Sequence, residues 1–468
     1  MAHHPDTEPA VVDGPPRIAA PDHEQPSPPR GRAWLITAML TVLMVINFGD
    51  KVVLGIAAKP LMNELDISKA QYGLVASAFF FLFGISSVAV GFLANLMSTR
   101  WVLLGMAVIW SAAMMPIVLI ATLPALLGSR VLLGAAEGPT IGIAQHAVQK
   151  WFPDSRRALP TAVVNIGAAL GVVIAPLLTY LTVRHGWRAP FTALAIAGLV
   201  WAVIWFAVGK EGPLTTYGAS QDQDQHTNTD QHTNTDQHTN TDQDTEAIVV
   251  AEEPRVPYRK LLLSRSFVGM CAGGFAAYFT IALMLTWLPA YLEDVEGFSE
   301  QHAGSFLAVP RAVAVVLELA VPVAAGRWMR RGASRRAARA GTSAVILIVS
   351  GTALAAALAP GSGGLFQMAL FTVAFSVPSI VFIFSALVVV DISPVGQRGA
   401  TLGIGTAIMT SAGVVAPALM GALVGPFDDP GVGYRIGFLV PALAMILGGI
   451  AVALWVNPDR DARRLGLR

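Results

Sequence analysis

The chain has 468 residues, of which 54% are apolar and only 13% are charged, and its formal net charge is +1. A soluble protein carries about a quarter charged residues, so this composition indicates a membrane protein. The near-zero net charge argues against nucleic acid as a partner. The single cysteine, Cys271, excludes a disulfide framework and a cysteine metal cluster.

The first 30 residues are polar and rich in proline. They lack the apolar core of a cleavable signal peptide. We therefore predict that residues 1–32 form a disordered cytoplasmic tail.

Apolar runs of about 20 residues, each long enough to cross a bilayer as a helix, recur through the rest of the chain. Six precede a polar segment and six follow it, so we predict an all-α membrane protein with twelve transmembrane helices in two bundles, 33–209 and 265–457, before a short tail, 458–468. The predicted spans are 33–57, 70–94, 101–121, 125–149, 158–182, 189–209, 266–291, 301–326, 339–360, 363–389, 399–424 and 433–457.

The polar segment, residues 210–264, is predicted to be a cytoplasmic linker. It contains three tandem copies of QHTNTD, from Gln225 to Asp242. The histidines of the repeats would allow metal binding. A repeat this polar buries no apolar surface, however, which favours a disordered tether.

Basic residues in the loops predict the orientation. If both termini are cytoplasmic, the inner loops hold about sixteen lysines and arginines and the outer loops about five. The outer loop at 292–300 carries four acidic residues instead. We therefore expect a multi-pass protein of the cell membrane with both termini in the cytoplasm.

Two charged pairs interrupt otherwise apolar spans, namely Asp50 with Lys51 in the first and Arg130 with Glu137 in the fourth. An ionisable side chain at the bilayer centre costs at least about 2.5 to 3.5 kcal/mol, so function is the usual reason for its presence. Arg130 and Glu137 share one helical face about 10 Å apart, and Asp50 lies at a depth between them. If the two spans face each other, these three side chains form a ladder of acid, base and acid.

Such a ladder can carry a proton across the membrane. A carboxylate holds its proton weakly beside a cation and strongly when it is removed from water. Opening or closing a cavity changes which effect dominates, so a proton can be taken up on one side and released on the other. The alternative is a static Arg–Glu pair that fixes helix packing, although such pairs stabilise weakly.

Two further cations are candidates for binding an anion. Lys51 would hold a substrate carboxylate, unless its side chain extends to the outer membrane surface. Arg311, in the eighth span, lies seven residues before Glu318 on the same face. It would hold an anion from the opposite half of the protein or simply pair with Glu318, and the sequence leaves both open.

The sequence contains no Walker loop, HExxH or GxSxG motif, so neither ATP-driven transport nor hydrolysis is supported. We expect no enzyme activity, no cofactor and no metal. Proton-coupled transport fits best, with an exporter or antiporter of the same fold and a non-transporting membrane sensor as alternatives.

Several motifs resemble the major facilitator superfamily, and within it the anion:cation symporter branch of sialin-like, galactonate, glucarate and phthalate carriers. They are NFGDKVVL (47–54), ELDISKAQYGLVASAFF (64–80), RVLLGAAEGPT (130–140), WFPDSRRA (151–158), GWRAPF (186–191) and TWLPAYL (286–292). The resemblance implies two pseudo-symmetric bundles around a midplane site, proton-coupled uptake of a small organic anion, and a monomer.

The resemblance also implies roles for the charged residues. Asp50 and Glu137 would be the protonatable pair, and Arg130 would tune Glu137. Lys51 stands where the branch has a substrate-binding arginine, and it keeps the charge but loses the bidentate fork.

Two positions in the second half match substrate-facing positions of the branch. Tyr278 corresponds to a frequent tyrosine, and Thr406 stands where the branch often has asparagine.

The chain departs from the branch at both inner gate loops. Asn95 replaces an aspartate after the second span, and Gly326 and Arg327 stand in the corresponding loop after the eighth. Phe48 and Phe83 also occupy positions often held by tyrosine, which predicts a substrate less hydroxylated than a sugar acid, such as an aromatic or alkyl carboxylate.

Overall fold

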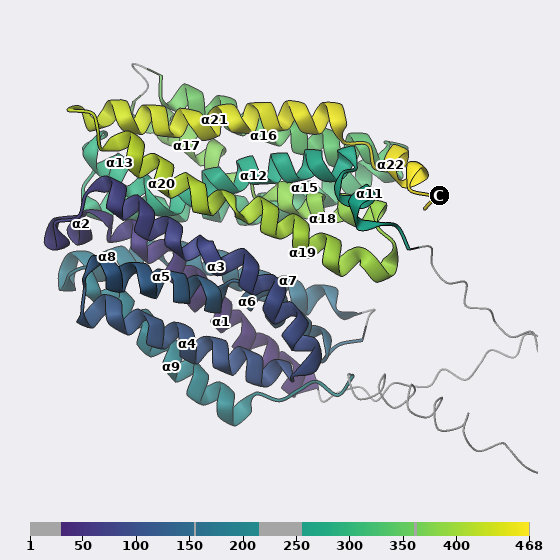
Figure 1. Ribbon diagram of the computed structural model, residues 1–468, viewed down its shortest axis with the longest axis horizontal. Helices are drawn as coiled ribbons and strands as arrows, with labels where there is room; N and C mark the ends of the chain where they lie inside the picture. Colours follow the sequence, from purple (N-terminus) through teal and green to yellow (C-terminus); the bar gives the residue numbers. More distant parts are fainter. Residues whose placement is uncertain (1–29, 154–155, 215–254, 360–362, 468) are drawn as a thin grey trace, which may run out of the picture.

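The computed structural model describes residues 30–153, 156–214, 255–359 and 363–467, which form a bundle of helices (Figure 1). The predicted tail up to residue 29 and the QHTNTD repeats lie outside the described residues. So does the side chain of Asn95, although its backbone belongs to a described helix.

The first half of the chain supplies six spans. Its helices are α1 (Arg30–Ile56), α2 (Ala58–Leu65), α3 (Lys69–Leu96), α4 (Thr99–Leu119), α5 (Leu123–Glu137), α6 (Thr140–Gln149), α7 (Ala158–Val173), α8 (Ala175–His185) and α9 (Arg188–Val208).

The second half supplies six more spans after the short helix α11 (Tyr258–Leu262). Its helices are α12 (Arg265–Thr286), α13 (Leu288–Asp294), α14 (Glu300–Phe306), α15 (Ala308–Arg330), the π-helix η2 (Arg336–Gly341), α16 (Thr342–Ala357), α17 (Gly364–Ser376), α18 (Ile380–Ile392), the short 3-10 helix η3 (Val395–Gln397), α19 (Arg398–Thr410), α20 (Ala412–Val424), α21 (Pro430–Trp455) and α22 (Pro458–Arg464).

Eleven segments of the described chain are long and apolar enough to cross a membrane, and several of them consist of two successive helices, such as α7 with α8. The fourth predicted span is not among the eleven but is also helical, and it is divided into α5 and α6 at Gly138 and Pro139. Proline lacks the backbone N–H that continues a helix, and membrane proteins tolerate such breaks inside a packed bundle. The break directly follows Glu137, one of the predicted site residues.

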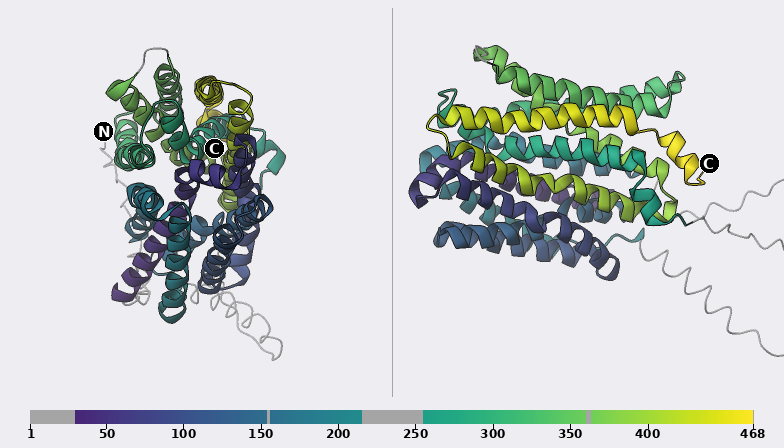
Figure 2. Two further views of the ribbon diagram at one scale, coloured as in Figure 1. Left: turned by 90° about the vertical axis from the view of Figure 1, so that its left-hand side faces the viewer. Right: turned by 45° about the horizontal axis from the view of Figure 1, so that its top comes forward.

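The two halves lie side by side with their helices running in the same general direction (Figures 1 and 2). Glycine allows their backbones to meet. A Cβ atom on Gly55 would lie 2.0 Å from the carbonyl oxygen of Leu285, and one on Gly73 would lie 2.5 Å from that of Pro417. Any side chain at either position would force α12 or α20 away from the first half.

The two ends of the bundle differ in what they carry. Figure 1 shows α22 and α11 at one end, called here the α22 end, and α2, α8 and α13 at the other, called here the α13 end. Because α1 runs from Arg30 towards α2, its first residue also lies at the α22 end. The segment predicted as a C-terminal tail includes the helix α22, where the Asp461 carboxylate accepts a hydrogen bond of 2.8 Å from the backbone N–H of Ser266.

Candidate functional site

The centre of the site is an ion pair between the first and fourth spans. The Lys51 Nζ atom lies 2.8 Å from Oε2 of Glu137, and the two side chains are 6% and 0% exposed. Lys51 also donates to Oδ1 of Asn47, one helical turn earlier, at 2.5 Å. Lys51 therefore points into the protein, and its side chain does not extend to the membrane surface.

Asp50 lies beside this pair and is fully buried. No hydrogen-bond donor of the described residues contacts its carboxylate. It lies close enough to the Glu137 carboxyl for the two groups to share a hydrogen bond once one of them carries a proton. Two buried carboxylates beside one lysine leave negative charge that a proton can neutralise, so this arrangement can bind and release a proton.

Arg130 occupies a neighbouring place and is also buried. Its guanidinium lies 5.6 Å from the ring centroid of Phe191, a cation–π contact. Its Nε and Nη2 atoms have no hydrogen-bond partner in the described part of the chain. The predicted ladder is therefore arranged differently, because the cation that contacts Glu137 is Lys51.

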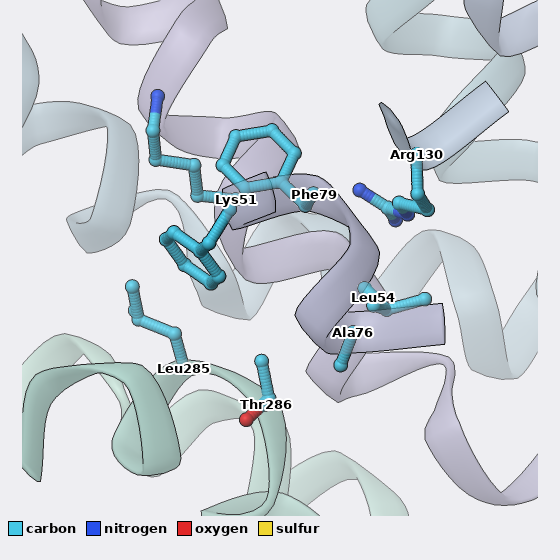
Figure 3. A pocket seen from close by; sticks show the side chains of 8 residues that line it. Lys51, Leu54, Ala76, Phe79, Arg130, Leu285 and Thr286 are labelled. Atoms are coloured by element: carbon cyan, nitrogen blue, oxygen red, sulfur yellow. The ribbon is translucent and has the colours of Figure 1, made fainter. Parts of the chain in front are cut away.

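A small cavity of about 10 Å³ adjoins these residues, which is room for about one water molecule. It is lined by Lys51, Leu54, Ala76, Phe79, Phe80, Arg130, Leu285 and Thr286. Figure 3 shows that Leu285 and Thr286 come from the second half, whereas Lys51, Phe79 and Arg130 come from the first. The cavity thus lies where the two halves meet.

The other predicted site residues lie in the second half, and they differ in what they contact. The Tyr278 ring packs against Phe80 at a centroid distance of 5.8 Å, and its hydroxyl interacts electrostatically with Glu137. Arg311 forms a bidentate pair with Glu318, at 2.7 and 3.2 Å. Thr406 is exposed, and its hydroxyl donates to the carbonyl of Leu402.

The two halves are joined by polar contacts towards the α13 end. The Tyr72 hydroxyl donates to the carbonyl oxygen of Thr286 at 2.8 Å. Lys59 pairs with Asp294 at 2.8 Å and with Glu293 at 3.5 Å. These contacts, together with Gly55 and Gly73, close the α13 end in this conformation.

Sequence reasoning missed several residues of the site. Asn47 precedes Lys51 by four positions, the helical spacing that brings side chains together, and this spacing was the available signal. Phe79 and Phe80 belong to an apolar run that looks like any lipid-facing or core segment. Leu285 and Thr286 give no sequence signal, because only the contact between the halves brings them to the cavity.

The fold and the site define a membrane transporter built from two six-span halves with ionisable residues at their junction. A family model described as Major Facilitator Superfamily matches residues 40–388, so the chain belongs to that superfamily. The chain is 26% identical over 421 residues to a hexuronate transporter of Bacillus subtilis (strain 168), covering 88% of this chain and 92% of the relative.

Two further similarities extend the comparison. The chain is 26% identical over 443 residues to a D-galactonate transporter of Escherichia coli O6:H1, covering 94% of this chain and 98% of the relative. A bacterial homologue of the lysosomal transporter Spinster has a similar structure, with a TM-score of 0.70 at 17% identity over 93% of this chain and 99% of that one. The resemblance to the superfamily and its anion-transporting branch is confirmed, as is the expectation of a transporter and not an enzyme.

Proposed function

We propose that this protein is a secondary active transporter that imports a small organic anion together with protons. The observation that carries the proposal is the buried Lys51–Glu137 ion pair with a second buried carboxyl, that of Asp50, next to Glu137. The relatives named as hexuronate and D-galactonate transporters support an organic anion as the substrate.

The geometry suggests how the anion and the proton are coupled. The Lys51 ammonium is the cation that an entering carboxylate would bind, but Glu137 occupies it. A proton on Glu137 weakens this ion pair and frees the ammonium for the substrate. Asp50 adds a second carboxylate that favours a proton at the same place. Anion and proton then enter together, because protonation of Glu137 releases Lys51 for the anion, and an anion bound to Lys51 leaves Glu137 free to take up the proton.

The transport cycle would alternate access between the two ends of the bundle. The contacts at the α13 end hold that side closed, and opening it requires Tyr72 to separate from Thr286. Lys59 must also separate from Glu293 and Asp294, and Lys69, whose Nζ lies 3.7 Å from Asp294, must separate from that carboxylate. The excess of basic residues in the loops of the α22 end supports a cytoplasmic location for this end and for both termini. The functional unit is proposed to be a monomer in the cell membrane.

Uptake into proteoliposomes tests the proposal. Radiolabelled carboxylates would be offered with and without an inward proton gradient. We expect at least one of them to accumulate above its outside concentration only when both the gradient and the protein are present, since protein-free vesicles report the entry of undissociated acid through the lipid. Accumulation driven by an outward gradient would instead identify an antiporter, and no flux for any organic anion would refute the proposal.

A further inference from the structure

An aromatic cluster surrounds the charged centre and extends across both halves of the protein. Its members are Phe48, Phe79, Phe80, Phe83, Tyr278 and Phe382. Within α3, the ring centroids of Phe79 and Phe80 lie 5.0 Å apart, and those of Phe79 and Phe83 lie 5.6 Å apart. Aromatic side chains at such distances form a continuous apolar wall.

Three rings of this cluster contact the Lys51 ammonium directly. Its Nζ atom lies 4.5 Å from the ring centroid of Phe48 and 5.7 Å from those of both Phe79 and Phe83. In the view of Figure 3, the Phe79 ring lies between the side chains of Lys51 and Arg130. The cation that would bind a carboxylate is therefore set among aromatic rings.

The wall continues into the second half. The Phe80 ring meets Tyr278 edge-on at 5.8 Å, and Tyr278 meets Phe382 edge-on at 6.0 Å. A molecule that leaves Lys51 in the direction of the second half thus passes along aromatic surface.

Groups able to bind hydroxyls are unevenly distributed around the cavity. Free polar atoms gather beside Lys51, where Asn47 Nδ2 has no partner within the described residues and the Asp50 and Glu137 carboxyls accept no hydrogen bond beyond that of Lys51. Arg130, which also lines the cavity, adds its free Nε and Nη2 donors. Away from these charged residues the cluster offers the Tyr278 hydroxyl. The Thr286 hydroxyl, which lines the cavity, already donates to the carbonyl of Ala282 at 2.7 Å.

We propose that the substrate is a small monocarboxylate with an apolar, preferably aromatic body, and this inference rests on the proposed function. The carboxylate binds Lys51, and the body lies against the aromatic cluster. A hexuronate or aldonate would bury several hydroxyls against rings that offer them no hydrogen bond, and each unpaired hydroxyl weakens binding. The proposed substrate of this protein thus differs from the sugar acids named for the two relatives, hexuronate and D-galactonate.

Direct uptake of four labelled acids tests the inference: phenylacetate, cyclohexanecarboxylate, galacturonate and galactonate. After subtraction of the uptake by protein-free vesicles, which undissociated apolar acids can enter unaided, we expect phenylacetate and cyclohexanecarboxylate to be taken up at least about tenfold faster than either sugar acid, a ratio within reach of a site that leaves hydroxyls unpaired. Faster uptake of the sugar acids would overturn the inference and leave the proposed function standing. No uptake of any of the four would count against both.

Conservative variants test the role of the rings themselves. Phe48→Tyr and Phe83→Tyr each add one hydroxyl while keeping the ring. Each should lower the ratio of phenylacetate uptake to sugar-acid uptake severalfold. Phe366→Tyr is the matched control, because Phe366 is 67% exposed on α17, outside the cluster. If both cluster variants keep normal thermal stability and the same ratio of phenylacetate uptake to sugar-acid uptake, the aromatic rings do not determine the selectivity.

Discussion

The Lys51 Nζ atom lies 2.8 Å from Oε2 of Glu137, although the two residues are 86 positions apart in the chain. This contact joins the first and fourth spans inside an apolar bundle, where an unpaired charge would be costly. Because the same ammonium is the cation nearest to the aromatic cluster, one group faces both the proton-binding carboxylates and the proposed substrate. Anion and proton binding are therefore expected to be coupled through this one ammonium.

The first prediction concerns the two carboxylates. Asp50→Asn and Glu137→Gln remove the groups that would bind the proton, so proton-driven accumulation should fall to passive equilibration while exchange of substrate across the membrane persists. Uptake and counterflow in the same proteoliposomes separate the two activities. Asp428→Asn, in an exposed loop, serves as the control. If both carboxylate variants concentrate substrate like the unmodified protein, the ion pair is structural.

The second prediction concerns the stability of the ion pair. Lys51→Met leaves Glu137 buried without its cation, which should lower the free energy of unfolding by about 3 to 5 kcal/mol. The double variant Lys51→Met with Glu137→Gln removes both charges and should recover most of this loss while remaining inactive. Thermal denaturation in detergent measures both effects. Equal destabilisation by the single and double variants would argue against the pair as the source of the loss.

The third prediction concerns closure of the α13 end. Gly55→Ala would place a Cβ atom 2.0 Å from the Leu285 carbonyl, so it should shift the protein towards conformations open at this end. Gly105→Ala is the control, because a Cβ atom there meets nothing within 4 Å. Spin labels at the exposed Asn63 and His302, in a Cys271→Ala background, report the separation of the halves. A distance distribution unchanged by Gly55→Ala would contradict the role given to this contact.

The fourth prediction concerns the pH at the α13 end. Glu293 lies beyond the spanning segment that ends at Thr286, and burial raises the pKa of its carboxyl to about 7. The Lys59 ammonium works in the opposite direction, and Glu300 and Asp294 add to the effect of burial. If the α13 end opens, water returns and the pKa falls towards its ordinary value.

The sign of the pH effect follows from this difference. A proton binds more tightly to the closed form, so lowering the pH from 8 to 6 should favour closure of the α13 end. The same spin labels measure the shift, which should be less than tenfold per pH unit because Glu293 keeps some contact with solvent. Glu293→Gln should reduce this pH dependence and keep the end closed at pH 8. An opening on acidification would reverse the sign and reject the linkage.

The sequence predicted much of the fold, because membrane spans leave a strong apolar signal. The twelve expected spans are present as helix, and the positions of Asp50, Arg130 and Glu137 within buried segments followed from their neighbours in sequence. Pro139 was visible in the sequence, but the division of the fourth span directly after Glu137 was not predicted from it.

The pairing within the site could not be predicted in the same way. Spacing along one helix placed Arg130 on the same face as Glu137, but the packing of α1 beside this span decides that Lys51 is the cation in contact. Contacts between the halves, such as Tyr72 with Thr286, depend on how two distant bundles meet. Periodicity within a helix carries no information on such contacts.

Anion and proton are proposed to move together through the Lys51–Glu137 site. The most direct measurement records internal pH in proteoliposomes, with a trapped fluorescent indicator, when a transported carboxylate is added outside without a pre-existing proton gradient. The unmodified protein should acidify the interior faster than protein-free vesicles do, and Glu137→Gln, in vesicles of equal protein content, should not exceed the protein-free rate. Anion entry without acidification by the unmodified protein, or equal acidification by the variant, would contradict this proposal.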